Sequence, residues 1–189
     1  PTVTEVVRAE LTVQPIDETM LERAPRLDYA EIGRRYLAQT QWRARGKAWF
    51  IDKLPINYVQ AGFIARALPQ ARILHMTRAP LDVCFSNWRA FFGAGYAYSY
   101  ALDALAAQYS DYRRVMAHWH AIMPGRILDV SYEALTGDPA RVAHEVFDFC
   151  GLPFEPGALD ISRNTAPVAT LSAMQVRGAI RRREVAEWA

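Results

Sequence analysis

The stretch AWFIDKLPINYVQAGFIARALPQARILHM, residues 48–76, decides the fold class. It opens with the apolar run AWFI (48–51) and closes with ARILHM (71–76), and both runs are typical of buried strands. Between them, residues 57–68 predict a helix that ends before Pro69, because five apolar side chains recur at helical spacing: Tyr58, Val59, Phe63, Ile64 and Leu68. A strand, a helix and a strand within about 30 residues predict a βαβ unit with parallel strands and a right-handed crossover.

The flanking sequence extends this pattern in both directions. Upstream, Asp28 and Glu31 have the spacing of a capping box, which predicts a helix from there to about Arg43. Downstream, the pattern predicts a helix from Pro80, a long helix over 101–122, a third strand within 124–132, and a helix between Gly137-Asp138-Pro139 and Gly151. We therefore expect an α/β fold of three layers, with a mostly parallel sheet flanked by helices.

Composition excludes several classes of protein. The chain has 189 residues, a net charge of +2 and 51% hydrophobic residues, which fits one globular domain rather than a disordered segment. No apolar run approaches the roughly 20 residues of a membrane span. Cys84 and Cys150 form no disulfide framework, so we expect a reducing, cytoplasmic setting. The small charge and the lack of a recognised motif argue against a nucleic-acid partner, and the basic cluster Arg177–Arg183 is either a solvated face or a polyanion contact.

The sequence also gives no sign of a metal or of a self-sufficient nucleotidase. The four histidines, His75, His118, His120 and His144, have no metal-ligand spacing, and His118 and His120 lie on different faces of their helix. We therefore expect no metal site. The absence of the GxxxxGK[ST] phosphate loop argues against an NTPase or a kinase.

Two cations lie at the edge where a parallel sheet binds ligands, beyond the carboxyl ends of its strands. Lys53, one of two lysines beside 20 arginines, follows the first predicted strand, and Arg78 follows the second. Arg78, the start of the next helix and Ser86 within that helix would together suit a phosphate. The alternatives are that Arg78 pairs with Asp82 while Ser86 packs, and that Lys53 is an ordinary surface side chain at a strand end.

Four stretches together resemble a known family: residues 50–88, RILDVSYEALTGDP (126–139), FDFCGLPFEP (147–156) and SAMQVR (172–177). They are similar to the sulfotransferases that use 3′-phosphoadenosine 5′-phosphosulfate (PAPS), and most of all to a bacterial branch that resembles tyrosylprotein sulfotransferases. The likeness runs from about residue 28 to the end of the chain. It implies a P-loop-like sulfotransferase fold with PAPS as co-substrate.

The resemblance also implies residue roles. Arg78 and Ser86 match the Arg and Ser that hold the 3′-phosphate, with the same spacing. Tyr132 and Ser172 match residues that contact the nucleotide, and Lys53 matches the Lys beside the transferred sulfuryl group. That Lys would neutralise charge on the bridging oxygen as the nucleotide leaves.

The chain departs from the family pattern at its beginning and near its end. Residues 1–189 contain no PRSGTT-like loop for the 5′-phosphosulfate, and the Glu proposed as base in the tyrosylprotein branch would precede residue 1. Glu187 stands where the family has a basic residue, for which Arg182 and Arg183 are candidates to substitute. We therefore expect 1–189 to be a single sulfotransferase domain without its N-terminal part, inactive by itself.

The resulting hypothesis is sulfuryl transfer from PAPS to a hydroxyl acceptor, without a metal. The alternative is a non-catalytic module that binds adenosine 3′,5′-bisphosphate (PAP) or a partner protein. A protein tyrosine, a sugar and a small phenol or alcohol all remain open as acceptors, and the Tyr-rich stretch 96–100 either packs or lines the acceptor pocket.

Overall fold

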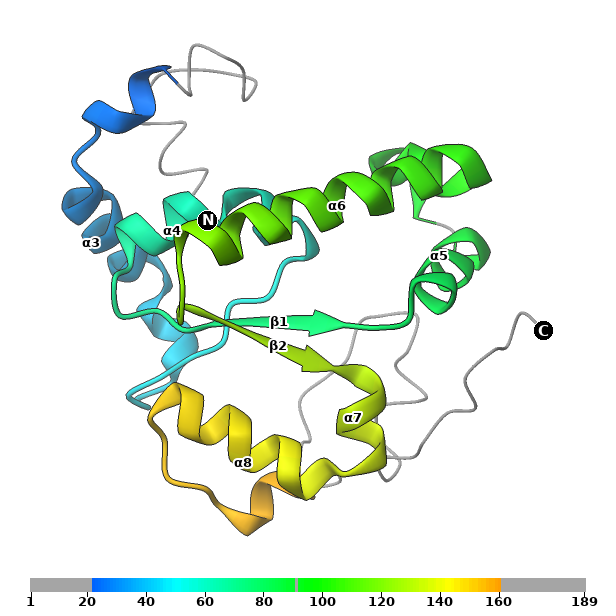
Figure 1. Ribbon diagram of the computed structural model, residues 1–189. Helices are drawn as coiled ribbons and strands as arrows, with labels where there is room; N and C mark the ends of the chain where they lie inside the picture. The colour runs from blue at the N-terminus through cyan, green and yellow to red at the C-terminus, as the bar shows by residue number, and fades with distance from the viewer. Residues whose placement is uncertain (1–21, 91, 161–189) are drawn as a thin grey trace. The chain divides into compact units, whose positions relative to one another are not determined.

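The computed structural model describes residues 22–90 and 92–160, which group into two compact units (Figure 1). The first unit comprises the described residues up to Ala71 together with Val115–Trp119, and the second comprises Arg72–Arg114 and the described residues from His120 onward. Ser172, Glu187 and the cluster Arg177–Arg183 lie outside the described residues.

The first unit is organised around helix α3 (Tyr29–Thr40). Its first turn is capped as predicted, because the Asp28 carboxylate accepts a hydrogen bond from the Glu31 N–H at 3.0 Å. The 3₁₀ helix η2 (Gln41–Ala44) continues the chain beyond α3, so the predicted end near Arg43 is close to the observed one.

The core of this unit lies between α3 and the short helix α4 (Ala61–Ala67), which follows the 3₁₀ helix η3 (Pro55–Gln60). Ile32 and Tyr36 are almost wholly buried there, with Phe63 and Ile64 packed against them. The two helices approach closely at Gly33, where an added Cβ would lie only 1.9 Å from the Ala67 carbonyl oxygen. This position therefore has room for glycine alone.

The prediction of a strand at residues 48–51 is wrong. These residues have no ladder partner among the described residues, and Ile51 is 88% exposed. A strand forms only when a neighbouring strand makes hydrogen bonds with its backbone N–H and C=O groups. An apolar run does not show whether that neighbour is present. The expected βαβ unit consequently lacks its first strand in this structure.

The second unit contains a parallel sheet of two strands within the described residues, β1 (Ile73–Thr77) and β2 (Ile127–Ser131). Their register pairs Ile73 with Ile127 at one end and Thr77 with Ser131 at the other. Both strands were predicted from their apolar runs. The parallel pairing and the mixture of helix and strand confirm the α/β class.

Helices cover both faces of this sheet (Figure 1). One side carries the long helix α6 (Leu102–Ile122), and α8 (Pro139–Cys150) lies on the other. The remaining elements of the unit are the helices α5 (Pro80–Arg89) and α7 (Tyr132–Gly137) and the 3₁₀ helices η4 (Gly93–Tyr100) and η5 (Pro156–Leu159). The α8 boundaries match the predicted signals, because Asp138 caps its start and Gly151, at φ 68°, ends it in the left-handed conformation.

Two further observations concern the Tyr-rich stretch and membrane spans. In the Tyr-rich stretch, the Tyr96 and Tyr98 rings pack edge to face, with their centroids 6.0 Å apart. Within residues 22–90 and 92–160, no helix combines the length and the apolar character needed to cross a membrane.

Candidate functional site

The ends of the two parallel strands bring two predicted site residues together. Thr77 and Ser131 are register partners at the carboxyl ends of β1 and β2, and Arg78 and Tyr132 are the residues that follow them. The Arg78 guanidinium carbon lies over the Tyr132 ring, 5.0 Å from its centroid. A cation stacked on an aromatic face is held electrostatically by the ring's quadrupole. Arg78 and Tyr132 are therefore neighbours at the edge where parallel sheets bind ligands.

A carboxylate on α5 also lies beside the Arg78 guanidinium. The nearest Arg78 amino nitrogen lies 3.6 Å from the Asp82 carboxylate, and Asp82 is only 5% exposed. The ion pair named above as the alternative for Arg78 is thus present. This ion pair does not use all the donors of the guanidinium, because the buried Arg78 Nε has no hydrogen-bond partner among the described residues. A buried donor without an acceptor is costly, so this nitrogen is suited to an incoming anion.

The beginning of α5 supplies further donors beside Arg78. The helix starts at Pro80, and its N-cap residue, Ala79, has no side chain that bonds to the first turn. Ser86 lies one helical turn beyond Asp82, hence on the same face of α5, and it is exposed. The start of a helix, a guanidinium and a hydroxyl together form an arrangement that can hold a phosphate.

Glu133 is a site residue that the sequence analysis missed. One of its carboxylate oxygens accepts from the Ala79 N–H at 2.9 Å, and the other accepts from the Ser131 hydroxyl at 2.8 Å. Burial raises the pKa of Glu133, but these hydrogen bonds and the nearby Arg78 charge outweigh burial and bring that pKa below its usual value. Glu133 thereby ties the end of β1 to the end of β2. A signal was present, since an acid in a helix's first turn, two residues after a Ser N-cap, can reach backbone N–H groups.

Lys53 lies in the first unit, on an exposed segment between Asp52 and η3. The preceding residue anchors that segment to α3, because the Tyr36 hydroxyl donates to the Asp52 carboxylate and Arg43 lies 3.5 Å from it. The pKa of Tyr36 is raised, chiefly by burial and secondly by this hydrogen bond. Asp52 is thus a structural partner, while the association of Lys53 with Arg78 remains a prediction, as does the role of Ser172 outside the described residues.

A second group of polar side chains was not predicted either. Asp129 on β2 contacts His75 on β1 and His120 on α6. Spacing along the chain did not reveal this cluster, because the fold brings together residues from two strands and a helix. It lies within the strands rather than beyond their carboxyl ends.

The described residues form an α/β protein whose two parallel strands are followed by Arg78 and Tyr132 at the carboxyl edge of the sheet, where such folds bind ligands. Comparison with known proteins then identifies the family. The model of the sulfotransferase family matches residues 2–156, and the chain belongs to that family.

Two further proteins are similar to the chain, one in sequence and one in fold. An uncharacterised protein of Aquifex aeolicus (strain VF5) is 36% identical over 141 residues, which cover 73% of this chain and 18% of that protein. The chain therefore spans less than a fifth of that relative's length. The sulfotransferase domain from the curacin biosynthetic pathway is similar in fold, with a TM-score of 0.53 and 16% identity over 84% of this chain and 57% of that one.

Proposed function

We propose that this chain binds PAPS and contributes to the transfer of its sulfuryl group to a hydroxyl acceptor. One observation above all supports the proposal: Arg78 is held at the carboxyl edge of the sheet by Asp82 and Tyr132, yet its buried Nε has no partner among the described residues. Membership of the sulfotransferase family makes a nucleotide phosphate the natural occupant of such a site.

The 3′-phosphate of the nucleotide would be bound by three groups of the second unit. The Arg78 Nε–H and an amino N–H would donate to two phosphate oxygens, and the Ser86 hydroxyl would donate to the third. The start of α5 adds a favourable dipole. Tyr132 would contact the nucleotide, and Ser172 is proposed to do so from the C-terminal part of the chain. All these roles act on binding and orientation.

Lys53 is proposed to act on the chemical step. The acceptor oxygen attacks sulfur in line, a new S–O bond forms, and the bond between sulfur and the bridging oxygen breaks to release PAP. Negative charge grows on that bridging oxygen, and an ammonium group beside it stabilises the transition state. The acceptor's proton passes to a base that we place upstream of residue 1, as in the tyrosylprotein branch.

The acceptor and the longer protein are part of the same proposal. The acceptor would be a hydroxyl group of a protein tyrosine, a sugar, or a small phenol or alcohol. The free thiols of Cys84 and Cys150 fit a reducing, cytoplasmic setting. We further propose that residues 1–189 are one sulfotransferase domain, completed by an upstream phosphosulfate loop.

The binding role is tested with Arg78→Ala. Calorimetric titration with PAP should show a dissociation constant raised about 10- to 150-fold, because a hydrogen bond to a charged group contributes about 1.5–3 kcal/mol. Arg89→Ala is the matched control, since Arg89 lies in the last turn of the same helix, 5.4 Å from the Phe85 ring. Equal affinity in Arg78→Ala and the wild type would remove Arg78 from the site.

The catalytic role is tested with Lys53→Ala in the intact protein. We expect kcat for sulfuryl transfer to fall about 100-fold or more while PAP affinity is kept, as for other groups that act only in the transition state. Lys47→Ala changes the other lysine, which is also exposed, and should leave kcat unchanged. An undiminished kcat in Lys53→Ala would refute the assignment.

A further inference from the structure

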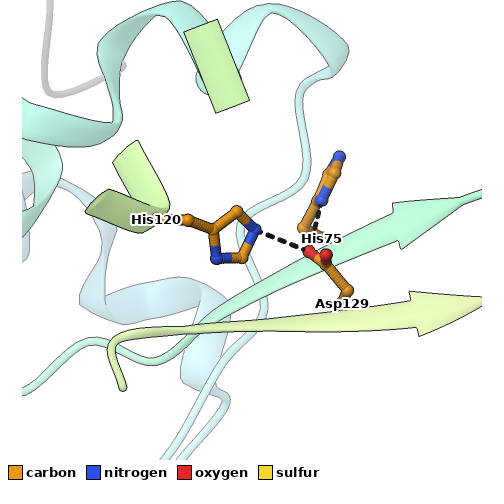
Figure 2. A group of neighbouring side chains, drawn as sticks. All are labelled: His75, His120 and Asp129. Carbon is orange, nitrogen blue, oxygen red and sulfur yellow. Dashed lines mark hydrogen bonds and ion pairs between the residues drawn. The ribbon is translucent and has the colours of Figure 1, made fainter. Parts of the chain in front are cut away.

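We propose that His75, His120 and Asp129 form a zinc site, separate from the nucleotide edge. Figure 2 shows the three side chains converging from β1, α6 and β2. His75 Nδ1 lies 2.7 Å and His120 Nε2 lies 2.9 Å from the same Asp129 carboxylate oxygen. One ligand atom from each residue lies within 4.8 Å of the other two.

The strand register explains why two of these ligands share a face. His75 and Asp129 are direct register partners in the parallel pair, so their side chains leave the sheet on the same side. His120 reaches them from the last turn of α6. The backbone of three elements therefore aims the three donors at one point, and no flexible loop supplies a ligand.

The donor set suits zinc. Zn²⁺ is bound by imidazole nitrogens and carboxylate oxygens, and three protein ligands leave a fourth position for water. In a tetrahedral site with bonds of about 2.0–2.1 Å, ligand atoms lie about 3.3 Å apart. The observed separations of 2.7 and 2.9 Å would need to widen by about half an ångström, which small side-chain rotations provide.

A second hydrogen bond orients His75 as a metal ligand requires. Its other ring nitrogen, Nε2, is bonded to the Tyr112 hydroxyl. Histidines that bind metals almost always use the ring nitrogen opposite the metal in such a bond, which sets the tautomer. A tyrosine hydroxyl can accept from Nε2–H, leaving Nδ1 unprotonated for the metal. The side chain of His75 is also only 13% exposed, so its orientation is well defined.

This inference departs from the expectation that the chain has no metal site, which stays a prediction until metal binding is measured. Bound zinc would link the last turn of α6 to both strands and so stabilise the second unit. The competing interpretation is a metal-free hydrogen-bond chain from Tyr112 through His75 and Asp129 to His120. The two interpretations differ in whether a metal binds, not in the contacts of the empty site.

The test is titration of the full chain with Zn²⁺ by calorimetry, paralleled by Co²⁺ absorption spectra that report ligand geometry. We expect one saturable Zn²⁺ per chain, an intense visible Co²⁺ band typical of four-coordination, and a rise in melting temperature on adding Zn²⁺. Failure to find a saturable site would overturn the proposal in favour of the hydrogen-bond chain.

Variants then assign the ligands. His120→Ala and Asp129→Asn should each abolish the Co²⁺ band, whereas His118→Ala should keep it, since His118 is exposed on the same helix and lies against Trp119. Tyr112→Phe retains all three ligands and should weaken Zn²⁺ binding about 10- to 100-fold. Because Tyr112→Phe is a mild change, it keeps the proposal testable even if a ligand variant fails to fold. Unchanged Zn²⁺ affinity in all these variants would place any bound metal elsewhere.

Discussion

Replacing Glu133 probes the contact that holds the two strand ends together. In Glu133→Ala, the Ala79 N–H loses its acceptor at 2.9 Å and the Ser131 hydroxyl loses its acceptor at 2.8 Å. A hydrogen bond to a charged group contributes about 1.5–3 kcal/mol, whereas the Ser131 hydroxyl can turn toward water. We therefore expect Glu133→Ala to lower the free energy of unfolding by about 1.5–3 kcal/mol. PAP affinity should fall as well, because Ala79 is next to Arg78.

The pH dependence of this effect has a definite sign. The pKa of Glu133 in the folded chain is below its ordinary value of 4.5. A carboxyl group with a lowered pKa stabilises the folded state above its unfolded-state pKa, and that stabilisation is lost as pH falls through the folded-state pKa. The difference in unfolding free energy between the wild type and Glu133→Gln should therefore be nearly constant between about pH 7 and about pH 5. It should shrink as the pH falls below 4.5, the ordinary pKa of a Glu carboxyl group.

Urea denaturation followed by circular dichroism measures both effects. Glu145→Ala is the control, because Glu145 is 51% exposed and its ion pair with Arg141 spans 3.4 Å at the surface. Such a pair contributes about 0–1 kcal/mol, so this variant should unfold almost like the wild type. If Glu133→Ala were as stable as Glu145→Ala, or if the effect of Glu133→Gln persisted in acid, the assigned role of Glu133 would be refuted.

Two further predictions concern the first unit. Gly33→Ala should lower the free energy of unfolding by about 1–3 kcal/mol, because its Cβ would lie 1.9 Å from a backbone oxygen and force α3 and α4 apart. Gly137→Ala is the control, because the space around its Cβ is open. Equal stability of the two variants would refute the close packing at Gly33. Tyr36→Phe should cost about 1–2 kcal/mol by removing the donor to Asp52. Since the pKa of Tyr36 is raised from 10.0, its stabilising effect should be complete below pH 10.0 and decline as pH rises further, and an effect that grows with alkaline pH would contradict this assignment.

The sequence predicted correctly those parts of the fold that depend on residues close together in the chain. The bond from Glu31 to Asp28 spans three residues, and the left-handed Gly151 directly follows α8, so both helix ends could be read from the chain. The pairing of Arg78 with Tyr132 was also within reach. It requires that the two apolar strands be adjacent, parallel and end level with each other, because the residues after their carboxyl ends are then neighbours.

Features that depend on distant neighbours could not be read in this way. The run at 48–51 has strand composition but no ladder partner among the described residues. Glu133 bonds to Ala79 across 54 positions, and His75 meets Asp129 across the same separation. Such contacts follow from the register of β1 against β2, which hydrophobic periodicity does not specify for short strands.

The central claim is that the edge formed by Arg78, Ser86 and Tyr132 binds the 3′-phosphate of the nucleotide. Calorimetric titration of the chain with PAP and, separately, with 5′-AMP tests it directly, because the two ligands differ only in that phosphate. We predict that PAP binds and that 5′-AMP binds at least about 10-fold more weakly, since 5′-AMP has no 3′-phosphate to accept the charge-assisted hydrogen bonds of Arg78. Equal affinity for the two nucleotides, or no binding of PAP, would contradict the account.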